Sequence, residues 1–295
     1  MINYAQEIKK RNSPRARIWE LDIARGICMV LMLFDHLMVN LATGFYHFHF
    51  SPALRSLSKI ASAYFISDLR VFGWIFTIGV FIFLSGISSG LSKNNAKRGF
   101  KLLLVAYLIT GVTQIISTVS GVEMTINFGV LHMLAFSILI YAFCIEKGEL
   151  SFKIKGFEIF LSDILSIILI FLVGYLTATN SVPIFFATGN IYETLFDAPL
   201  LSQFGYILGL TPDLLPSADY LPLLPWLAIF LCGATVSKRF YKDKKSLFPS
   251  CDFLSSTPLA KIGRKSLIIY IVHQPVLYFL LALIGWFFTG VFRLF

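Results

Sequence analysis

Long apolar stretches, separated by short polar segments, make up most of this chain. Because a helix needs about 20 apolar residues to cross the hydrocarbon core of a bilayer, the pattern predicts about seven transmembrane helices. The expected spans are 21–43, 68–91, 100–119, 127–145, 158–178, 221–237 and 266–290. The predicted fold is an all-α, polytopic membrane helix bundle.

The segment 179–220 fits this pattern least well. It contains four prolines and no basic residue, and its apolar piece at 199–210 is short for a crossing helix. We expect this piece to form a re-entrant or surface helix over the outer face. If it crossed the membrane, the number of spans would become eight and the later orientation would invert, which the basic residues at 238–245 argue against.

Composition agrees with an integral membrane protein in a lipid bilayer. Of the 295 residues, 57% are hydrophobic and 14% are charged, and so few charges do not cover the surface of a soluble domain of this length. The net charge of +9 does not indicate nucleic acid as a partner, because the basic residues lie in short segments between apolar stretches. That distribution follows the positive-inside rule.

The same charges predict the orientation of the chain. Of the 25 Lys and Arg residues, 21 lie at Arg25 or in the segments 1–20, 92–101, 146–157, 238–248 and 261–265. The segments 44–67, 119–126 and 179–220 contain only Arg55 and Lys59. We therefore expect a multi-pass cell-membrane protein with a basic cytoplasmic N-terminus at 1–20, one transmembrane domain at 21–295 and an outer C-terminus.

Four ionisable side chains lie in the first span, although each is costly in hydrocarbon and such groups usually face a protein interior or a cavity. They are Asp22, Arg25, Asp35 and His36. Arg25 and His36 are eleven residues apart. At ~100° and ~1.5 Å per residue, they share nearly one helix face and lie ~16 Å apart along the axis.

A polar pocket is expected toward the outer side of the membrane. The predicted topology allows Asp35, His36, Asn127, His132 and Asp219 to meet there. An imidazole titrates near neutral pH and transfers protons, and a nearby carboxylate orients its ring. His36, Asp35 and His132 are therefore candidate catalytic residues, and the alternative is that each histidine makes a structural hydrogen bond between helices.

Two further histidines, His47 and His49, follow the first span in the aromatic segment Phe45-Tyr-His-Phe-His-Phe50. One interpretation is an aromatic loop at the membrane interface. The other is a lid over the pocket or a second proton-transfer residue, which makes His47 a further catalytic candidate.

A basic cluster is expected on the opposite, cytoplasmic side. Its members are Arg25, Lys97, Arg98, Lys101, Lys261, Arg264 and Lys265. Guanidinium groups suit phosphate oxygens, whereas ordinary positive-inside anchoring is the alternative for most of these residues. Arg25 differs from the others because it points along the His36 face.

Two other patterns are structural. Ser85-Gly-Ile-Ser-Ser-Gly90 places small residues four apart, which favours a close approach of two helices. The four cysteines lie far apart, no pair has the spacing of metal ligands, and no metal is expected.

Several motifs occur together in one order over most of the chain. They are Leu21-Asp22-x-x-Arg25-Gly26, Phe128-Gly-Val-Leu-His132, Asp219-Tyr220 followed by Pro225-Trp226, and Gly263-x-x-Ser266 followed by Tyr270-x-x-His273-x-Pro275. In this order they resemble the catalytic-domain family of heparan-α-glucosaminide N-acetyltransferase, especially its short bacterial members. The spacing of ten residues between Arg25 and His36 is also similar to that of the acyltransferase-3 family.

The resemblance implies an acyltransferase that moves an acetyl group from cytosolic acetyl-CoA to a hydroxyl or amine of an extracytoplasmic glycan. Arg25 would then hold a CoA phosphate, with Arg98, Arg264 and Lys265 as further binding candidates, and His36 would be the general base. The larger enzyme has its catalytic histidine in the loop after the first span, where this chain has His47 and His49. It has an amide residue at the position aligned with His36.

Two other classes of function remain open at this point. Buried Asp, Arg and His side chains also occur in proton-coupled transporters, but the sequence has no inverted repeat or paired broken helices. The third, non-enzymatic hypothesis is that the protein is a structural subunit of an envelope-synthesis complex. The sequence leaves both a monomer and a homo-oligomer open.

Overall fold

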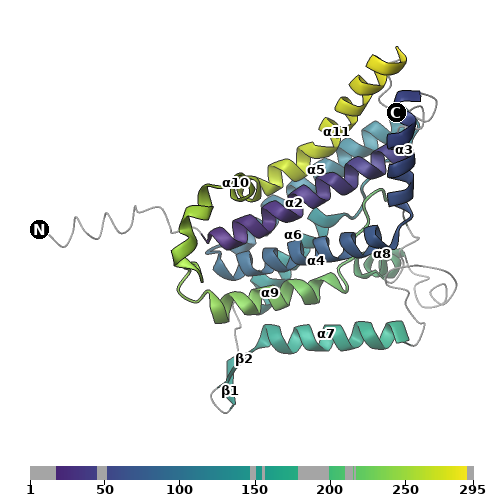
Figure 1. The fold of residues 1–295 in the computed structure, drawn as a ribbon. Helices are drawn as coiled ribbons and strands as arrows, with labels where there is room; N and C mark the ends of the chain where they lie inside the picture. Colours follow the sequence, from purple (N-terminus) through teal and green to yellow (C-terminus); the bar gives the residue numbers. More distant parts are fainter. Residues whose placement is uncertain are drawn as a thin grey trace, which may run out of the picture.

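The computed structural model describes residues 18–44, 52–146, 151–154, 157–178, 199–209, 215 and 217–290. Within these residues the chain is almost entirely helical, and a hairpin of two short strands is the exception. The fold is a helical membrane bundle, as the sequence predicted (Figure 1).

The elements follow one another along the chain in a simple order. They are α2 (Trp19–Val39), η1 (Asn40–Gly44), α3 (Pro52–Phe65), α4 (Asp68–Leu91), α5 (Asn95–Ser120), α6 (Val130–Ile140), η3 (Tyr141–Ile145), β1 (Ser151–Ile154), β2 (Phe157–Phe160), α7 (Leu161–Ala178), α8 (Pro199–Leu208), α9 (Trp226–Phe240), η5 (Pro249–Ser256), α10 (Pro258–Arg264) and α11 (Ser266–Thr289). The π-helical turns η1 and η3 continue α2 and α6.

Each of the seven predicted spans corresponds to one of these helices. Among the described residues, four helices are long and apolar enough to cross a membrane: Trp19–Thr43, Asp68–Leu91, Asn95–Ser120 and Ser266–Phe288. Two apolar helices are shorter, at Val130–Ile145 and Leu161–Leu172. The piece predicted as a re-entrant or surface helix is α8, which has ten residues.

The starts of α5 and α9 differ most from the predicted spans, each by five residues, and both differences have local reasons. Helix α5 begins five residues early because the side chain of Asn94 caps it, accepting a hydrogen bond of 2.9 Å from the backbone N–H of Lys97. Helix α9 begins at Trp226 instead of 221, since Pro222 and Pro225 stand in the segment before it and proline is disfavoured inside a helix.

Contacts at the helix ends show that the long helices alternate in direction. Arg25, near the start of α2, donates a hydrogen bond to Ser88 near the end of α4. Asp163 at the start of α7 pairs with Arg239 at the end of α9, at 2.5 Å. We call this end of the bundle, where α2 begins, the basic end.

The remaining helices fit the same alternation. At the basic end, Asn95 at the start of α5 donates to Glu146 directly after η3, at 3.1 Å. At the opposite end, which we call the histidine end, Arg70 in the first turn of α4 contacts Asp35 in the last turns of α2. The helices α2, α5, α7 and α11 therefore run one way, and α4, α6 and α9 run the other way (Figure 1).

Helices α4 and α9 cross closely because glycines face backbone at their contact. A Cβ added at Gly86 would lie 2.0 Å from the carbonyl oxygen of Phe230, and one at Gly233 would lie 2.1 Å from that of Phe83. The helix-packing role predicted for the small residues around Gly86 is confirmed. A second close crossing joins α2 to α10 through Gly26 and Gly263.

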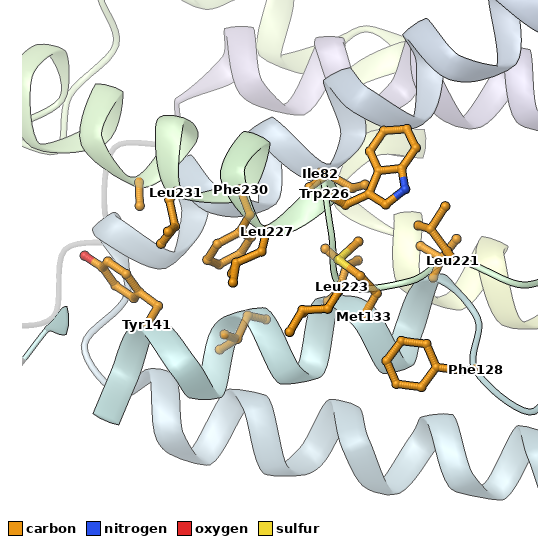
Figure 2. Packing of buried hydrophobic residues seen from close by; sticks show 14 of the residues in the cluster. Ile82, Phe128, Met133, Tyr141, Leu221, Leu223, Trp226, Leu227, Phe230 and Leu231 are labelled. Atoms are coloured by element: carbon orange, nitrogen blue, oxygen red, sulfur yellow. The ribbon is translucent and has the colours of Figure 1, made fainter. Parts of the chain in front are cut away.

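The largest buried apolar cluster lies between α4, α6 and α9. Figure 2 shows Ile82 of α4, Met133 of α6 and Phe230 of α9 meeting in it, with Trp226 nearby. The indole of Trp226 is buried at the point where α9 begins. This cluster fixes the three helices relative to one another, so the polar side chains at both ends have defined positions.

Helices on the outside of the bundle expose large apolar side chains. Examples from α5 and α11 are Leu104, Leu108, Ile115, Ile268, Phe279 and Phe287. Such surfaces match hydrocarbon and do not match water. Helix α3 lies across the histidine end (Figure 1), where Leu54 and Ala61 pack against Met38 and Leu41.

Candidate functional site

Two imidazole rings meet at the histidine end, one from α2 and one from α11. The ring centroids of His36 and His273 are 4.8 Å apart, with an interplanar angle of 83°. Beside them, the side chain of Asn40 donates to the side-chain oxygen of Gln274 at 2.9 Å. This pair joins α2 to α11 at the level of the two rings.

The His273 ring is linked by contacts to the partly buried carboxylate of Asp219. Its neighbour Tyr270, whose ring centroid lies 5.5 Å away, donates its hydroxyl to Asp219 at 2.9 Å. The same carboxylate oxygen accepts the backbone N–H of Val130 at 3.3 Å, in the first turn of α6. Asp219 therefore lies at a helix N-terminus, where a negative charge is favoured.

Gly129 precedes α6 and leaves room for this carboxylate. A Cβ there would lie 2.6 Å from the Asp219 side chain. The predicted motifs around His132, Asp219 and Tyr270 are thus brought together by tertiary contacts.

His132 is buried and has hydrogen-bond partners at both ring nitrogens. The backbone N–H of Gly129 donates to Nδ1 at 3.3 Å, so in the neutral ring Nε2 carries the hydrogen. Nε2 lies 3.3 Å from the hydroxyl of Thr110 on α5. For His132, this geometry favours the second interpretation from the sequence, a structural hydrogen bond between helices rather than a catalytic role.

The carboxylate of Asp35 binds side chains of α3 and α4. It accepts a hydrogen bond of 2.9 Å from the guanidinium of Arg70 and one of 3.1 Å from the hydroxyl of Tyr64. Burial and the Asp35 carboxylate raise the pKa of Tyr64, which therefore stays protonated and donates at neutral pH. The predicted pocket is thus divided, with Asp35 in one group and Asp219 in another.

Replacing Arg70 with Leu is expected to lower the free energy of unfolding by about 2 kcal/mol, because a mostly buried carboxylate loses its charged partner. Thermal unfolding in detergent measures this. The double variant Arg70→Leu with Asp35→Asn should recover part of the loss, since it no longer buries an unpaired charge. Additive losses from the two changes would contradict the pairing.

A second polar group lies at the basic end. The Arg25 guanidinium contacts Ser88 and lies 3.3 Å from the Asp22 carboxylate, one turn earlier on the same helix. Arg264 of α10 approaches the other oxygen of Asp22 at 3.9 Å. Asp22 therefore holds two guanidinium groups from different helices, which leaves the cluster net positive.

Arg98 joins this group from α5, within electrostatic range of Arg25. It donates to the hydroxyl of Ser89 at 3.2 Å. Arg25, Arg98 and Arg264, predicted from the sequence as one basic cluster, are brought together around α2. Lys265 is exposed at the junction of α10 and α11.

The segment after α9 closes over the start of α2. Glu20 accepts hydrogen bonds from the backbone of Leu247 at 2.8 Å and from the hydroxyl of Ser246 at 2.9 Å. Burial and the Glu20 carboxylate raise the pKa of Tyr241 to about 12. This tyrosine stays neutral at physiological pH and adds no negative charge beside the arginine cluster.

Three further predicted residues are His47, His49 and Asn127. His47 and His49 fall outside the described residues. The backbone N–H of Asn127 donates to the Ser217 hydroxyl at 3.1 Å, and this hydroxyl donates to the backbone oxygen of Asp219 at 3.2 Å, so Asn127 lies beside the Asp219 group. Within the described part of the chain, no three His, Cys, Asp or Glu residues gather as a metal site. Sequence reasoning missed Arg70 as a site neighbour, although a lone arginine in an apolar span was a usable signal.

These features define a helical membrane protein with an arginine cluster and a histidine pair near opposite ends of one helix. The profile of the family described as heparan-alpha-glucosaminide N-acetyltransferase, catalytic, matches residues 17–275 of the 295. The chain belongs to this family of membrane acetyltransferases, which confirms the resemblance in its motifs. No curated protein and no solved structure matches the chain.

Proposed function

We propose that the protein is a multi-pass membrane acyltransferase that uses acetyl-CoA as its donor and an extracytoplasmic saccharide hydroxyl or amine as its acceptor. The observation that carries this proposal is the placement of Arg25 and His36 on one uninterrupted helix. Their separation of ~16 Å along the axis is of the order of an extended pantetheine arm.

The orientation follows from the charges at the two ends of the bundle. Six of the seven helix ends at the basic end are next to Lys or Arg residues in the sequence. The basic residues of the histidine end are Arg55, Lys59 and Arg70, with Arg293 following α11 in the sequence. By the positive-inside rule, the basic end is cytoplasmic and the histidine end is outside. Acetyl-CoA would then bind from the cytosol, and the acceptor would approach from the other side.

At the basic end, Arg25, Arg98 and Arg264 supply guanidinium groups for the phosphates of CoA. Arginine presents several N–H donors in a planar arrangement that matches phosphate oxygens. Lys265 is exposed at the same end and is a further candidate for a phosphate contact. Ser88 and Asp22 hold the Arg25 side chain in place before the ligand arrives.

At the histidine end, His36 is the proposed general base. Its Nδ1 lies 2.9 Å from the backbone oxygen of Met32, which only accepts, so Nδ1 carries the hydrogen in the neutral ring and Nε2 carries the accepting lone pair. Nε2 takes the proton of the acceptor hydroxyl or amine, and the oxygen or nitrogen attacks the thioester carbonyl. The C–S bond breaks, and the departing CoA thiolate takes up a proton.

Binding of acetyl-CoA by the purified protein tests the proposal. Replacing Arg25 with Ala is expected to weaken the affinity about 10- to 100-fold, the loss of one or two charge-assisted hydrogen bonds. Calorimetry of acetyl-CoA binding in detergent measures this. The matched control is Arg239→Ala, which removes an arginine at the same end that pairs with Asp163 and should leave the affinity unchanged. Absence of binding by the wild type would overturn the proposed function.

A further inference from the structure

His273 is unusual among the polar side chains at the histidine end. It is buried, and its Nε2 makes no hydrogen bond within the part of the chain that the structure describes. Its Nδ1 lies 2.6 Å from the backbone oxygen of Tyr270 and therefore carries the hydrogen in the neutral ring. Nε2 is then a buried lone pair without a donor, and such atoms usually have a partner.

The His273 ring lies against the imidazole ring of His36. The two imidazoles share the same tautomer, because each Nδ1 is bonded to a carbonyl of its own helix. Both rings therefore present an accepting Nε2, and their centroids are 4.8 Å apart. A proton taken up by one ring would therefore lie next to the accepting nitrogen of the other.

We propose that His273 is a second proton-accepting residue of the acceptor site and forms one acid–base unit with His36. This inference rests on the proposed function. In the reaction, one proton leaves the acceptor hydroxyl or amine as the new C–O or C–N bond forms and the C–S bond breaks. The two imidazoles hold that proton between them, and the CoA thiolate receives it, so no proton is gained or lost overall.

Tyr270 and Asp219 are positioning residues for this unit. The Tyr270 hydroxyl is fixed to Asp219 at 2.9 Å, and Asp219 is fixed to the N-terminus of α6. The backbone oxygen of Tyr270 in turn holds Nδ1 of His273. The chain of contacts sets both the tautomer and the orientation of the second histidine.

The test compares His273→Gln with Gln274→Leu by steady-state kinetics, with acetyl-CoA as donor, glucosamine as the acceptor probe and release of CoA thiol as the signal. For His273→Gln we expect kcat to fall at least 10-fold, with KM for acetyl-CoA within twofold of wild type. Gln274→Leu breaks the bond to Asn40 at the same level of α2 and α11. It should lower the melting temperature and keep kcat within threefold.

Tyr270→Phe is the second variant, for the case that His273→Gln does not fold: it retains the His273 side chain and removes only the hydroxyl bond to Asp219 that positions it. For Tyr270→Phe we expect kcat to fall less than for His273→Gln, again with an unchanged KM for acetyl-CoA. In the double variant His36→Gln with His273→Gln, kcat should fall little further than in the more impaired single variant, because the effects of mutating residues that act as a unit are not additive.

The outcomes separate the two proposals. A wild type that binds no acetyl-CoA and releases no thiol contradicts the proposed function, and the inference with it. A wild type that turns over, with kcat of both the His273 and Tyr270 variants equal to that of Gln274→Leu, contradicts the inference alone.

Discussion

Replacement of His36 with Ala is expected to lower the turnover of acetyl-CoA with glucosamine about 10²- to 10⁴-fold, the usual contribution of a general base. The arginine cluster lies ~16 Å away along α2, by the helix rise, so the affinity for acetyl-CoA should stay unchanged. A fall in kcat at constant affinity identifies a residue that acts in the chemical step. Release of CoA thiol and calorimetric binding measure the two quantities.

His47→Ala is the comparison for this prediction, because His47 is the other candidate base from the sequence. If His36 is the base, His47→Ala should retain most of the activity. Full activity of His36→Ala together with inactivity of His47→Ala would assign the base to the segment after α2 and contradict our assignment.

Gly263→Val is expected to prevent stable folding of the basic end. The backbones of α10 and α2 are in direct contact here, and a Cβ at Gly263 would lie 1.8 Å from the carbonyl oxygen of Asp22. Neither backbone moves without separating the helices, so we expect a loss of about 3 kcal/mol or more. The separation would also remove Arg264 from Asp22 and weaken the binding of acetyl-CoA.

The matched control for this variant is Gly111→Ala. Gly111 lies in α5, and a Cβ there would have nothing within 4 Å. Since alanine is the better helix former, this change should leave the protein equally stable or stabilise it by about 0.5–1 kcal/mol. Thermal unfolding and size-exclusion chromatography in detergent distinguish the two variants. Wild-type stability of Gly263→Val would show that α10 does not pack on α2 in this way.

The glycines of the motifs show how far sequence reasoning reaches. Gly86 and Gly90 have the four-residue spacing of a close helix contact, and the α4–α9 crossing confirms that prediction. Gly26 and Gly263 lie far apart in the chain, and no spacing rule links them. Their contact follows from the way α10 lies on α2, which depends on the whole bundle.

The polar residues divide in the same way. The sequence predicts that Arg25, Arg98 and Arg264 gather at one end, because positive charges of alternating spans accumulate on one side of the membrane. It predicts that Asp35 and His36 share one polar pocket, in which a nearby carboxylate orients the imidazole ring. In the structure the Asp35 carboxylate forms an ion pair with Arg70 instead. Adjacent side chains on a helix point about 100° apart around its axis, so Asp35 and His36 face different neighbours.

The sequence by itself determined the apolar helices, their alternating order and the placement of Arg25 and His36 on one face of α2. These features depend on the length of apolar stretches and on helical periodicity, which are local properties. Only the tertiary structure decided that His273 lies against His36 and that Tyr270 reaches Asp219. Such pairings depend on how each helix is rotated and packed against its neighbours, and side-chain packing across the whole bundle sets those angles.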